Sequence, residues 1–193
     1  MRGTVGLPLP GLELRLADDG EILVRGATVF EGYLGRDDAT AEVLSPDGWL
    51  QTGDIGRVDE EGFVTITDRK KEIIVTAGGK KIAPQNLENA LKTSPVVSQA
   101  LVVGDRRPYI AALVSIDRDE AGKLTADGDE LRALVEKAVA NVNERLGRAE
   151  QIKRFAILSR DFSMEAGEVT PTLKLKRRIC EEHFGEEIEA LYA

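Results

Sequence analysis

Four short stretches of polar residues have the types and spacing that could carry chemistry. Asp54 closes the sequence Thr52-Gly53-Asp54 at an expected strand end, where a carboxylate can accept two hydrogen bonds from vicinal ribose hydroxyls. Arg69, followed by Lys71, offers a guanidinium for ribose or phosphate. Taken alone, Thr-Gly-Asp is also a common turn, and charged linkers between domains are ordinary.

Two further stretches combine lysine with glycine or threonine. Gly78 and Gly79 lie in TAGGKK, where the backbone could pass close to a ligand. The spacing Gly-x4-Gly-Lys-Ser/Thr of a phosphate loop is missing, so a hairpin turn is the better interpretation. Lys174 lies in a threonine-rich loop before an expected helix, from which an ammonium could neutralise a carboxylate attacking a phosphate. The alternative, a solvated basic run, would put positive charge at a helix N-terminus, which is unfavourable without an anion.

The remaining reactive residue types give no site. His183 is the only histidine and lies among acidic residues, and Cys180 falls on an apolar stripe, where it is expected to be a buried filler. No serine or cysteine has an evident histidine partner. No cluster of histidine, cysteine and carboxylates has metal-ligand spacing, so we expect no metal site in this chain.

Composition narrows the class of protein. The 193 residues are 42% hydrophobic and 31% charged, as in a soluble globular protein. A net charge of −8 and an aromatic content of 5% argue against a nucleic-acid partner. No apolar run approaches the roughly 18 residues of a transmembrane segment, and no secretory leader is evident. With a single cysteine, these features favour a cytoplasmic location.

Residues 1–67 are expected to form an antiparallel sheet of short strands. Glu13–Leu16 with Glu21–Arg25, and Ile55–Asp59 with Phe63–Thr67, flank turn residues typical of hairpins. Phe30–Leu34 is expected as a further strand, followed by turns at 37–40 and 45–48. With no helix long enough to cover it, this sheet looks like part of a larger domain, and its exposed apolar face favours dimerisation or aggregation.

Residues 72–193 are expected to form a small α/β domain because strands and helices alternate. Strands are expected at Ile73–Thr76, Val96–Val103, Tyr109–Ile116 and Ile152–Leu158. Helices are expected from Pro84 to about Thr93, across 131–146, and from about Lys176 onward. Residues 68–71 therefore join two unlike regions, and such junctions commonly hold hinges and ligand clefts.

In this order, the motifs closely resemble the adenylate-forming superfamily of acyl-CoA synthetases, luciferases and peptide-synthetase adenylation domains. Leu50–Asp54 resembles its ribose-binding motif, with the usual preceding segments at 26–34 and 39–42. Asp68–Glu72 resembles the hinge, and Thr170–Arg177 the lysine loop. The long-chain fatty acyl-CoA branch fits best on DRKKEIIVTAGGKKIAPQNLE and TPTLKLKR, and the resemblance covers essentially the whole chain. Thr172-Leu173 stands where peptide-synthetase domains usually have serine-glycine.

The resemblance implies a role for each motif residue. Asp54, with Thr52 in the same motif, would bind the ribose hydroxyls of ATP and the acyl-adenylate, and Arg69 the ribose or phosphate. Lys71 would be the hinge about which the small domain rotates between half-reactions. The Gly78-Gly79 hairpin would line the pantetheine tunnel for CoA. Lys174 would be the catalytic lysine that bridges the fatty carboxylate and the α-phosphate.

The resemblance also implies a domain plan and a set of partners. Residues 1–67 would be the C-terminal part of the large AMP-binding domain, 68–71 the hinge, and 72–193 the mobile C-terminal domain. The intact enzyme would be an ATP-dependent long-chain fatty acid–CoA ligase that uses fatty acid, ATP, CoA and Mg²⁺, with the Mg²⁺ ligands outside this chain. Peripheral association with membranes and homodimerisation stay open. The rival hypotheses are another adenylate-forming enzyme, such as a luciferase-like, aryl- or medium-chain CoA ligase, and a non-catalytic interaction module with the same fold.

The first testable prediction concerns the chain by itself. The family's phosphate loop, adenine-binding motif and acyl tunnel are expected to precede residue 1, so the chain is expected to be a C-terminal fragment without ligase activity. ATP–pyrophosphate exchange and acyl-CoA formation, measured on the purified 193 residues beside the longer protein, should be absent from the former. Turnover by the 193 residues alone would contradict this prediction.

Overall fold

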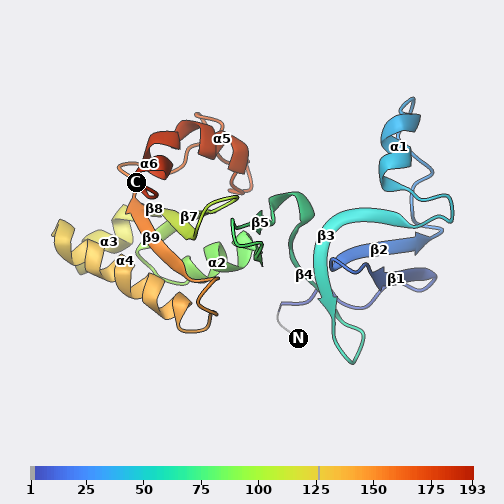
Figure 1. Ribbon diagram of the computed structural model, residues 1–193, viewed down its shortest axis with the longest axis horizontal. Helices are drawn as coiled ribbons and strands as arrows, with labels where there is room; N and C mark the ends of the chain where they lie inside the picture. Colours follow the sequence, from blue (N-terminus) through green and yellow to red (C-terminus); the bar gives the residue numbers. More distant parts are fainter. Residues whose placement is uncertain (1–2, 126) are drawn as a thin grey trace. The chain divides into compact units, whose positions relative to one another are not determined.

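The computed structural model describes residues 3–125 and 127–193, which form two compact units (Figure 1). Unit 1 ends at Ile73 and unit 2 begins at Ile74. The fold class is the expected one, an antiparallel β-rich part followed by a small α/β part. Unit 1 contains β1 Leu12–Leu16, β2 Glu21–Gly26, α1 Asp37–Val43, β3 Leu50–Val58, β4 Val64–Arg69 and the 3₁₀ turn η1 Lys70–Glu72.

Unit 1 is a four-stranded antiparallel sheet in the order β1-β2-β3-β4. Both expected hairpins are present, because β1–β2 and β3–β4 are joined by the glycine-containing turns that the sequence shows. Large apolar side chains on its strands are exposed, namely Leu16 at 39%, Val58 at 39% and Ile66 at 46%. The sheet is therefore only partly covered within the described residues.

Two expectations for residues 30–43 were wrong. Phe30–Leu34 is a loop, and the expected turn at 37–40 is the first part of helix α1. Asp37 and Asp38 lie in the first turn of α1, where negative charge favours a helix. The helix buries no residue, so it has no apolar stripe by which periodicity could reveal it.

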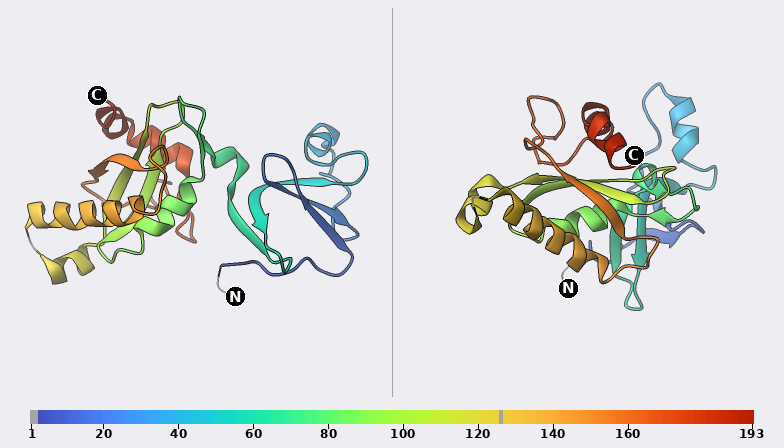
Figure 2. Two further views of the ribbon diagram at one scale, coloured as in Figure 1. Left: turned by 60° about the horizontal axis from the view of Figure 1, so that its bottom comes forward. Right: turned by 60° about the vertical axis from the view of Figure 1, so that its left-hand side comes forward.

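Unit 2 is built on the three-stranded sheet of β7 Val97–Val103, β8 Ile110–Ile116 and β9 Ile152–Ile157. β7 and β8 are antiparallel, whereas β8 and β9 are parallel. The other elements are β5 Ile74–Val75, β6 Lys81–Ile82, α2 Pro84–Leu91, α3 Arg118–Leu124, α4 Gly128–Asn143, α5 Arg177–His183 and α6 Gly185–Ala190. Helices cover both faces of this sheet, with α2 and α4 on one side and α5 and α6 on the other (Figures 1 and 2).

The two-sided cover explains why β7 and β8 are continuous apolar runs. Successive side chains of a strand point to opposite faces, so a strand buried on both faces needs apolar residues throughout. In β8, Ile110, Ala112 and Val114 enter the core beneath α2 and α4, whereas Ala111 and Leu113 enter the core beneath α5 and α6. All five are fully buried.

The helices of unit 2 differ from expectation in two places. Helix α3 was not expected; Asp117 caps it by accepting hydrogen bonds from the amides of Asp119 and Glu120, and Ala121 is its one buried residue. The last helix breaks at Phe184 into α5 and α6, although its expected stripe of Cys180, Phe184, Ile188 and Leu191 is buried as one surface.

Candidate functional site

Asp54 and Arg69 meet across the β3–β4 ladder in unit 1. The two residues are paired in register, and the Nε of Arg69 lies 3.0 Å from the Oδ1 of Asp54. The guanidinium also donates to the carbonyl of Thr52 at 3.3 Å, and the Thr52 hydroxyl accepts from the amide of Asp54 at 3.1 Å. Three of the residues singled out from the sequence therefore form one cluster.

Gly53 shapes this cluster through its backbone. Its φ of +71° lies in the left-handed region that side chains disfavour. Its amide donates to the buried carboxylate of Glu21 at 2.9 Å, and the Thr52 hydroxyl donates to the carbonyl of Ile22 at 2.7 Å. These contacts hold the Thr52–Asp54 backbone against β2, while the Asp54 side chain stays 24% exposed and the Arg69 side chain 57% exposed.

The basic stretch at 69–71 is divided between two environments. Arg69 is the last residue of β4, and Lys70 is fixed by ion pairs to Glu21 at 2.7 Å and Asp19 at 2.8 Å. The Asp19 and Glu21 carboxylates raise the pKa of the Lys70 ammonium. Lys71 is exposed and starts the stretch of chain, 71–73, that leads to the boundary between the units.

Gly78 and Gly79 lie in the turn between β5 and β6 in unit 2. Gly79 has a φ of +75° and donates its amide to the carbonyl of Thr76 at 2.8 Å. A side chain at Gly79 would meet no described atom within 4 Å, so positive φ alone explains this glycine. The turn is anchored beside it, where the Ala77 amide donates to the carbonyl of Arg107 at 2.9 Å.

Lys174 lies on a short β-hairpin of unit 2. The Lys176 amide donates to the Glu168 carbonyl at 2.7 Å, Val169 and Leu175 form a bridge, and the Thr170 amide donates to the Lys174 carbonyl at 2.8 Å. The Lys174 amide in turn donates to the Thr170 hydroxyl at 3.0 Å. The exposed Lys174 ammonium has no hydrogen-bond or ion-pair partner in the part of the chain that the structure describes.

The basic run after Lys174 is only partly solvated. Arg177, in the first turn of α5, pairs with the buried Glu88 of α2 at 2.6 Å and donates to the Val102 carbonyl of β7 at 2.7 Å. Glu88 also accepts from the Val102 amide at 2.8 Å. The positive charge at this helix N-terminus is therefore compensated by a protein carboxylate.

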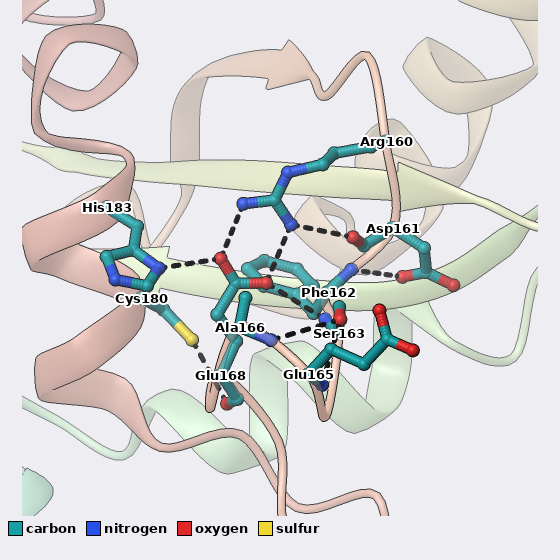
Figure 3. A network of polar contacts seen from close by, with 9 residues as sticks. All are labelled: Arg160, Asp161, Phe162, Ser163, Glu165, Ala166, Glu168, Cys180 and His183. Atoms are coloured by element: carbon teal, nitrogen blue, oxygen red, sulfur yellow. Dashed lines mark hydrogen bonds and ion pairs between the residues drawn. The ribbon is translucent and has the colours of Figure 1, made fainter.

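Figure 3 shows a buried carboxylate at the base of the lysine hairpin that the sequence did not single out. Both oxygens of Glu168 accept from the two terminal nitrogens of Arg160, at 2.6 and 2.7 Å, and Oε2 also accepts from the Ser163 amide at 2.9 Å. The Nδ1 of His183 lies 2.8 Å from Oε1. The Arg160 guanidinium, with His183 and the Ser163 amide, lowers the pKa of Glu168 to about 2 against the opposing effect of burial.

His183 lies among acidic residues in the sequence, and in the structure it contacts the buried carboxylate of Glu168, as Figure 3 shows. Cys180 is the buried filler expected from its stripe. Its thiol donates to the Glu168 carbonyl at 3.3 Å, and burial raises its pKa to about 11, which disfavours the thiolate. No signal in the sequence alone pairs positions 160, 168 and 183.

The structure thus brings Thr52, Asp54 and Arg69 together in unit 1. It places Lys174 and the Gly78-Gly79 turn at separate points of unit 2, with no hydrogen bond or ion pair between them among the described residues. Within residues 3–125 and 127–193, no group of three or more histidine, cysteine or carboxylate side chains could hold a metal ion. The same residues include no helix that is long and apolar enough to cross a membrane.

Unit 2 of the chain is similar to a known protein family. Residues 71–193 match the model of the AMP-binding enzyme C-terminal domain. The chain belongs to this family. The match starts at Lys71, next to the boundary between the two units.

Two curated relatives are similar to this chain over both of its units. It is 50% identical to the long-chain-fatty-acid–CoA ligase FadD15 of Mycobacterium tuberculosis, over 98% of this chain and 34% of that protein. It is 33% identical to the long-chain-fatty-acid–CoA ligase ACSBG1 of Rattus norvegicus, over 97% of this chain and 31% of that protein. The chain therefore spans about a third of the length of these relatives.

Solved structures of adenylation domains are also similar to this chain over both of its units. The adenylation domain of a carboxylate reductase from Mycobacterium chelonae matches 96% of this chain and 31% of that domain, with a TM-score of 0.81 and 28% identity. A didomain of carboxylic acid reductase from Segniliparus rugosus in complex with AMP matches 97% of this chain and 28% of its own, also with a TM-score of 0.81 and 28% identity.

A second prediction concerns the charge on Glu168. Its pKa falls on folding from 4.5 to about 2, so its stabilising contribution is present above pH 4.5 and is lost as the pH falls toward 2. Glu168→Gln should lower the free energy of unfolding of unit 2 by about 2 kcal/mol at pH 7. This is less than the about 3 kcal/mol that the pKa change alone implies, because water screens the 47% exposed Arg160. The difference from the native chain should shrink below pH 4.5.

Urea unfolding should be followed by far-ultraviolet circular dichroism or tyrosine fluorescence, because the single tryptophan, Trp49, reports on unit 1. Glu165→Gln is the matched control: this exposed carboxylate on the same loop should leave the free energy unchanged within about 0.5 kcal/mol. A Glu168→Gln effect that stays constant from pH 7 to pH 2.5 would contradict the assignment.

A third prediction concerns Leu173, whose φ of +58° is unusual for a residue with a side chain. Because this side chain is 59% exposed, substitution changes mainly the backbone preference. Leu173→Gly should raise the free energy of unfolding of unit 2 by about 0.5 kcal/mol, and Leu173→Ile should lower it by about 1 kcal/mol.

The same change at an equally exposed helical leucine gives the control. Leu124 is 58% exposed and is the last residue of α3, and Leu124→Gly should lower the free energy of unfolding by about 0.5 kcal/mol. Equal effects of glycine at positions 124 and 173 would show that the hairpin tip does not hold Leu173 in the left-handed region.

Proposed function

We propose that this chain is the C-terminal part of an ATP-dependent long-chain fatty acid–CoA ligase. The intact enzyme would convert fatty acid, ATP and CoA into acyl-CoA, AMP and pyrophosphate through an acyl-adenylate. The observation that carries the proposal is the exposed ammonium of Lys174, which has no partner among the described residues and lies on a hairpin whose base is buried. The 50% identity to a named long-chain-fatty-acid–CoA ligase supports the choice of substrate class.

Lys174 would serve the adenylation step. A fatty carboxylate and the α-phosphate of ATP are both anionic, so their approach is opposed by repulsion until a cation lies between them. The Lys174 ammonium is free of carboxylates among the described residues, which leaves its charge available for this purpose. Its main chain is bonded twice to Thr170, so the lysine would start from a defined backbone position.

Asp54 and Arg69 would hold the ribose of ATP and of the acyl-adenylate. The Asp54 carboxylate is partly exposed, and its contact with Arg69 engages Oδ1, leaving acceptor capacity for vicinal hydroxyls. Arg69 keeps an exposed guanidinium beside it for the ribose or phosphate oxygens. Thr52 would hold the Asp54 backbone through its hydroxyl.

The remaining motif residues would serve the second half-reaction. The open Gly78-Gly79 turn would line the path of the CoA pantetheine, and Lys71 would be the hinge at the start of the mobile domain, residues 72–193. The 71–73 stretch supports this position, since the residues before it are fixed by β4 and by the ion pairs of Lys70. Mg²⁺ would be bound with ATP by residues outside this chain.

The intact enzyme would work in the cytoplasm, where ATP and CoA are available and thiols stay reduced. The exposed apolar side chains of unit 1 support the proposal that further protein, from the same polypeptide or from a second copy, covers them. Residues 1–67 would then belong to the large AMP-binding domain.

The fourth prediction separates the two half-reactions in the longer protein. Lys174→Ala should lower the rate of ATP–pyrophosphate exchange by at least about a hundredfold, because it removes charge stabilisation in adenylation. It should change thioester formation from supplied acyl-adenylate by less than about threefold. Lys176→Ala is the matched control, since this exposed lysine lies two residues away, and it should retain both rates.

Two outcomes would contradict the proposal. If Lys174→Ala lowered both half-reactions equally, the role of the hairpin in adenylation would be wrong. If the unsubstituted longer protein adenylated aryl or medium-chain acids in strong preference to long-chain fatty acids, the substrate class would be wrong and the rival ligase would replace it.

A further inference from the structure

Glu168 joins the buried charge cluster to the hairpin through two different parts of the same residue. Its side chain is fully buried and is held by Arg160, His183 and the Ser163 amide, as Figure 3 shows. Its carbonyl accepts from the amide of Lys176 at 2.7 Å, which is the first rung of the hairpin. Fixing the carboxylate therefore fixes the strand that leads toward Lys174.

The core around Glu168 could be filled without any ionic contact. Desolvation of a buried ion pair largely offsets its attraction, so an apolar side chain of similar volume could stabilise the core as well. An apolar side chain has no preferred direction, whereas a carboxylate gripped by both ends of a guanidinium is held in one orientation. The arrangement is thus better suited to setting geometry than to adding stability.

The tip of the hairpin has little else to hold it. Pro171, Thr172, Leu173 and Lys174 are exposed, and beyond the hairpin itself the one hydrogen bond to this tip among the described residues is a long one, 3.5 Å, from the Gln99 side chain to the Leu173 carbonyl. The position of the tip is therefore determined at its base. There, Val169 is buried in the core beside α5, and Glu168 precedes it.

We propose that Glu168, oriented by Arg160 and His183, is a positioning residue for Lys174: it sets the direction of the hairpin and so the place to which the ammonium is delivered. The inference rests on the proposed role of Lys174 in adenylation. Displacement of a catalytic group by about 1 Å can lower a rate by about a hundredfold, so a small tilt of the hairpin is sufficient to impair the step.

The fifth prediction uses the ratio of the two half-reactions in the longer protein. Arg160→Lys keeps a positive charge but loses the two-pronged grip, and Glu168→Gln keeps the shape but loses the charge. Each should lower kcat for ATP–pyrophosphate exchange by at least about tenfold, with KM for ATP and thioester formation from supplied acyl-adenylate changed by less than about threefold. His183→Ala should lower exchange less than either, because Arg160 still holds Glu168.

A matched control separates positioning from loss of stability. Val135 is fully buried in the core on the other face of the sheet, so Val135→Ala should destabilise unit 2 without moving the hairpin base. It should leave the ratio of the half-reactions unchanged. An equal change of ratio in Val135→Ala and Glu168→Gln would overturn the proposal.

Hydrogen exchange on the 193 residues gives a readout that needs no activity. In Arg160→Lys and Glu168→Gln, the amides of Thr170, Lys174 and Lys176 should exchange at least about tenfold faster through local opening of the hairpin, whereas a Val135→Ala variant with a similar loss of global stability should leave them unchanged. The amides of Leu101 and Leu113 in the sheet should accelerate in all three variants only as far as the loss of global stability requires. A folded Arg160→Lys with native exchange in the hairpin and a native ratio of half-reactions would overturn the proposal. If Lys174→Ala itself failed to lower adenylation selectively, the proposed function would fall instead, whatever the exchange data showed.

Discussion

Burial of both faces of the β7–β8–β9 sheet is the constraint on which unit 2 depends. The strands have apolar side chains on both surfaces, so helices must cover each side: α2 and α4 on one, α5 and α6 on the other. The chain reaches α5 only after β9, and the segment that crosses back from the sheet edge contains Glu168 and the lysine hairpin. The lysine hairpin is therefore part of a connection that the layered core requires.

Polar side chains are buried where elements of the two layers must be held in register. Glu88 joins α2 to β7 and to the start of α5 through Arg177, and Glu168 joins the segment after β9 to α5 through His183. Each carboxylate satisfies backbone amides as well as a cation, which removes the cost of leaving those groups unpaired. Apolar side chains fill most of the interior of the unit, and these ionic contacts link its layers at fixed points.

Much of this fold follows from local patterns in the sequence. The glycine turns predicted the β1–β2 and β3–β4 hairpins, and the apolar spacing of 131–146 predicted α4. Helices α1 and α3 were not predicted. Helix α1 buries no residue and α3 buries only Ala121, so neither sequence has an apolar stripe. The Asp54–Arg69 contact needs only the register of one hairpin, whereas the contacts among Arg160, Glu168 and His183 need β9 and α5 packed on the same sheet. Patterns in one segment cannot reveal such a pairing.

The lysine hairpin is fastened at both ends, by Glu168 where it begins and by Arg177 just after it ends. Both ends of the hairpin are therefore held at its base by the contacts between the layers of unit 2, and its tip projects beyond them. Because Leu101 and Phe184 lie in the core beneath α5, we expect a change in their volume to shift the base of the hairpin and, with it, the tip. Core residues that are not exposed to any ligand would then contribute to the position of the Lys174 ammonium. Substitutions in this core are therefore limited by the position of the hairpin as well as by the stability of the unit.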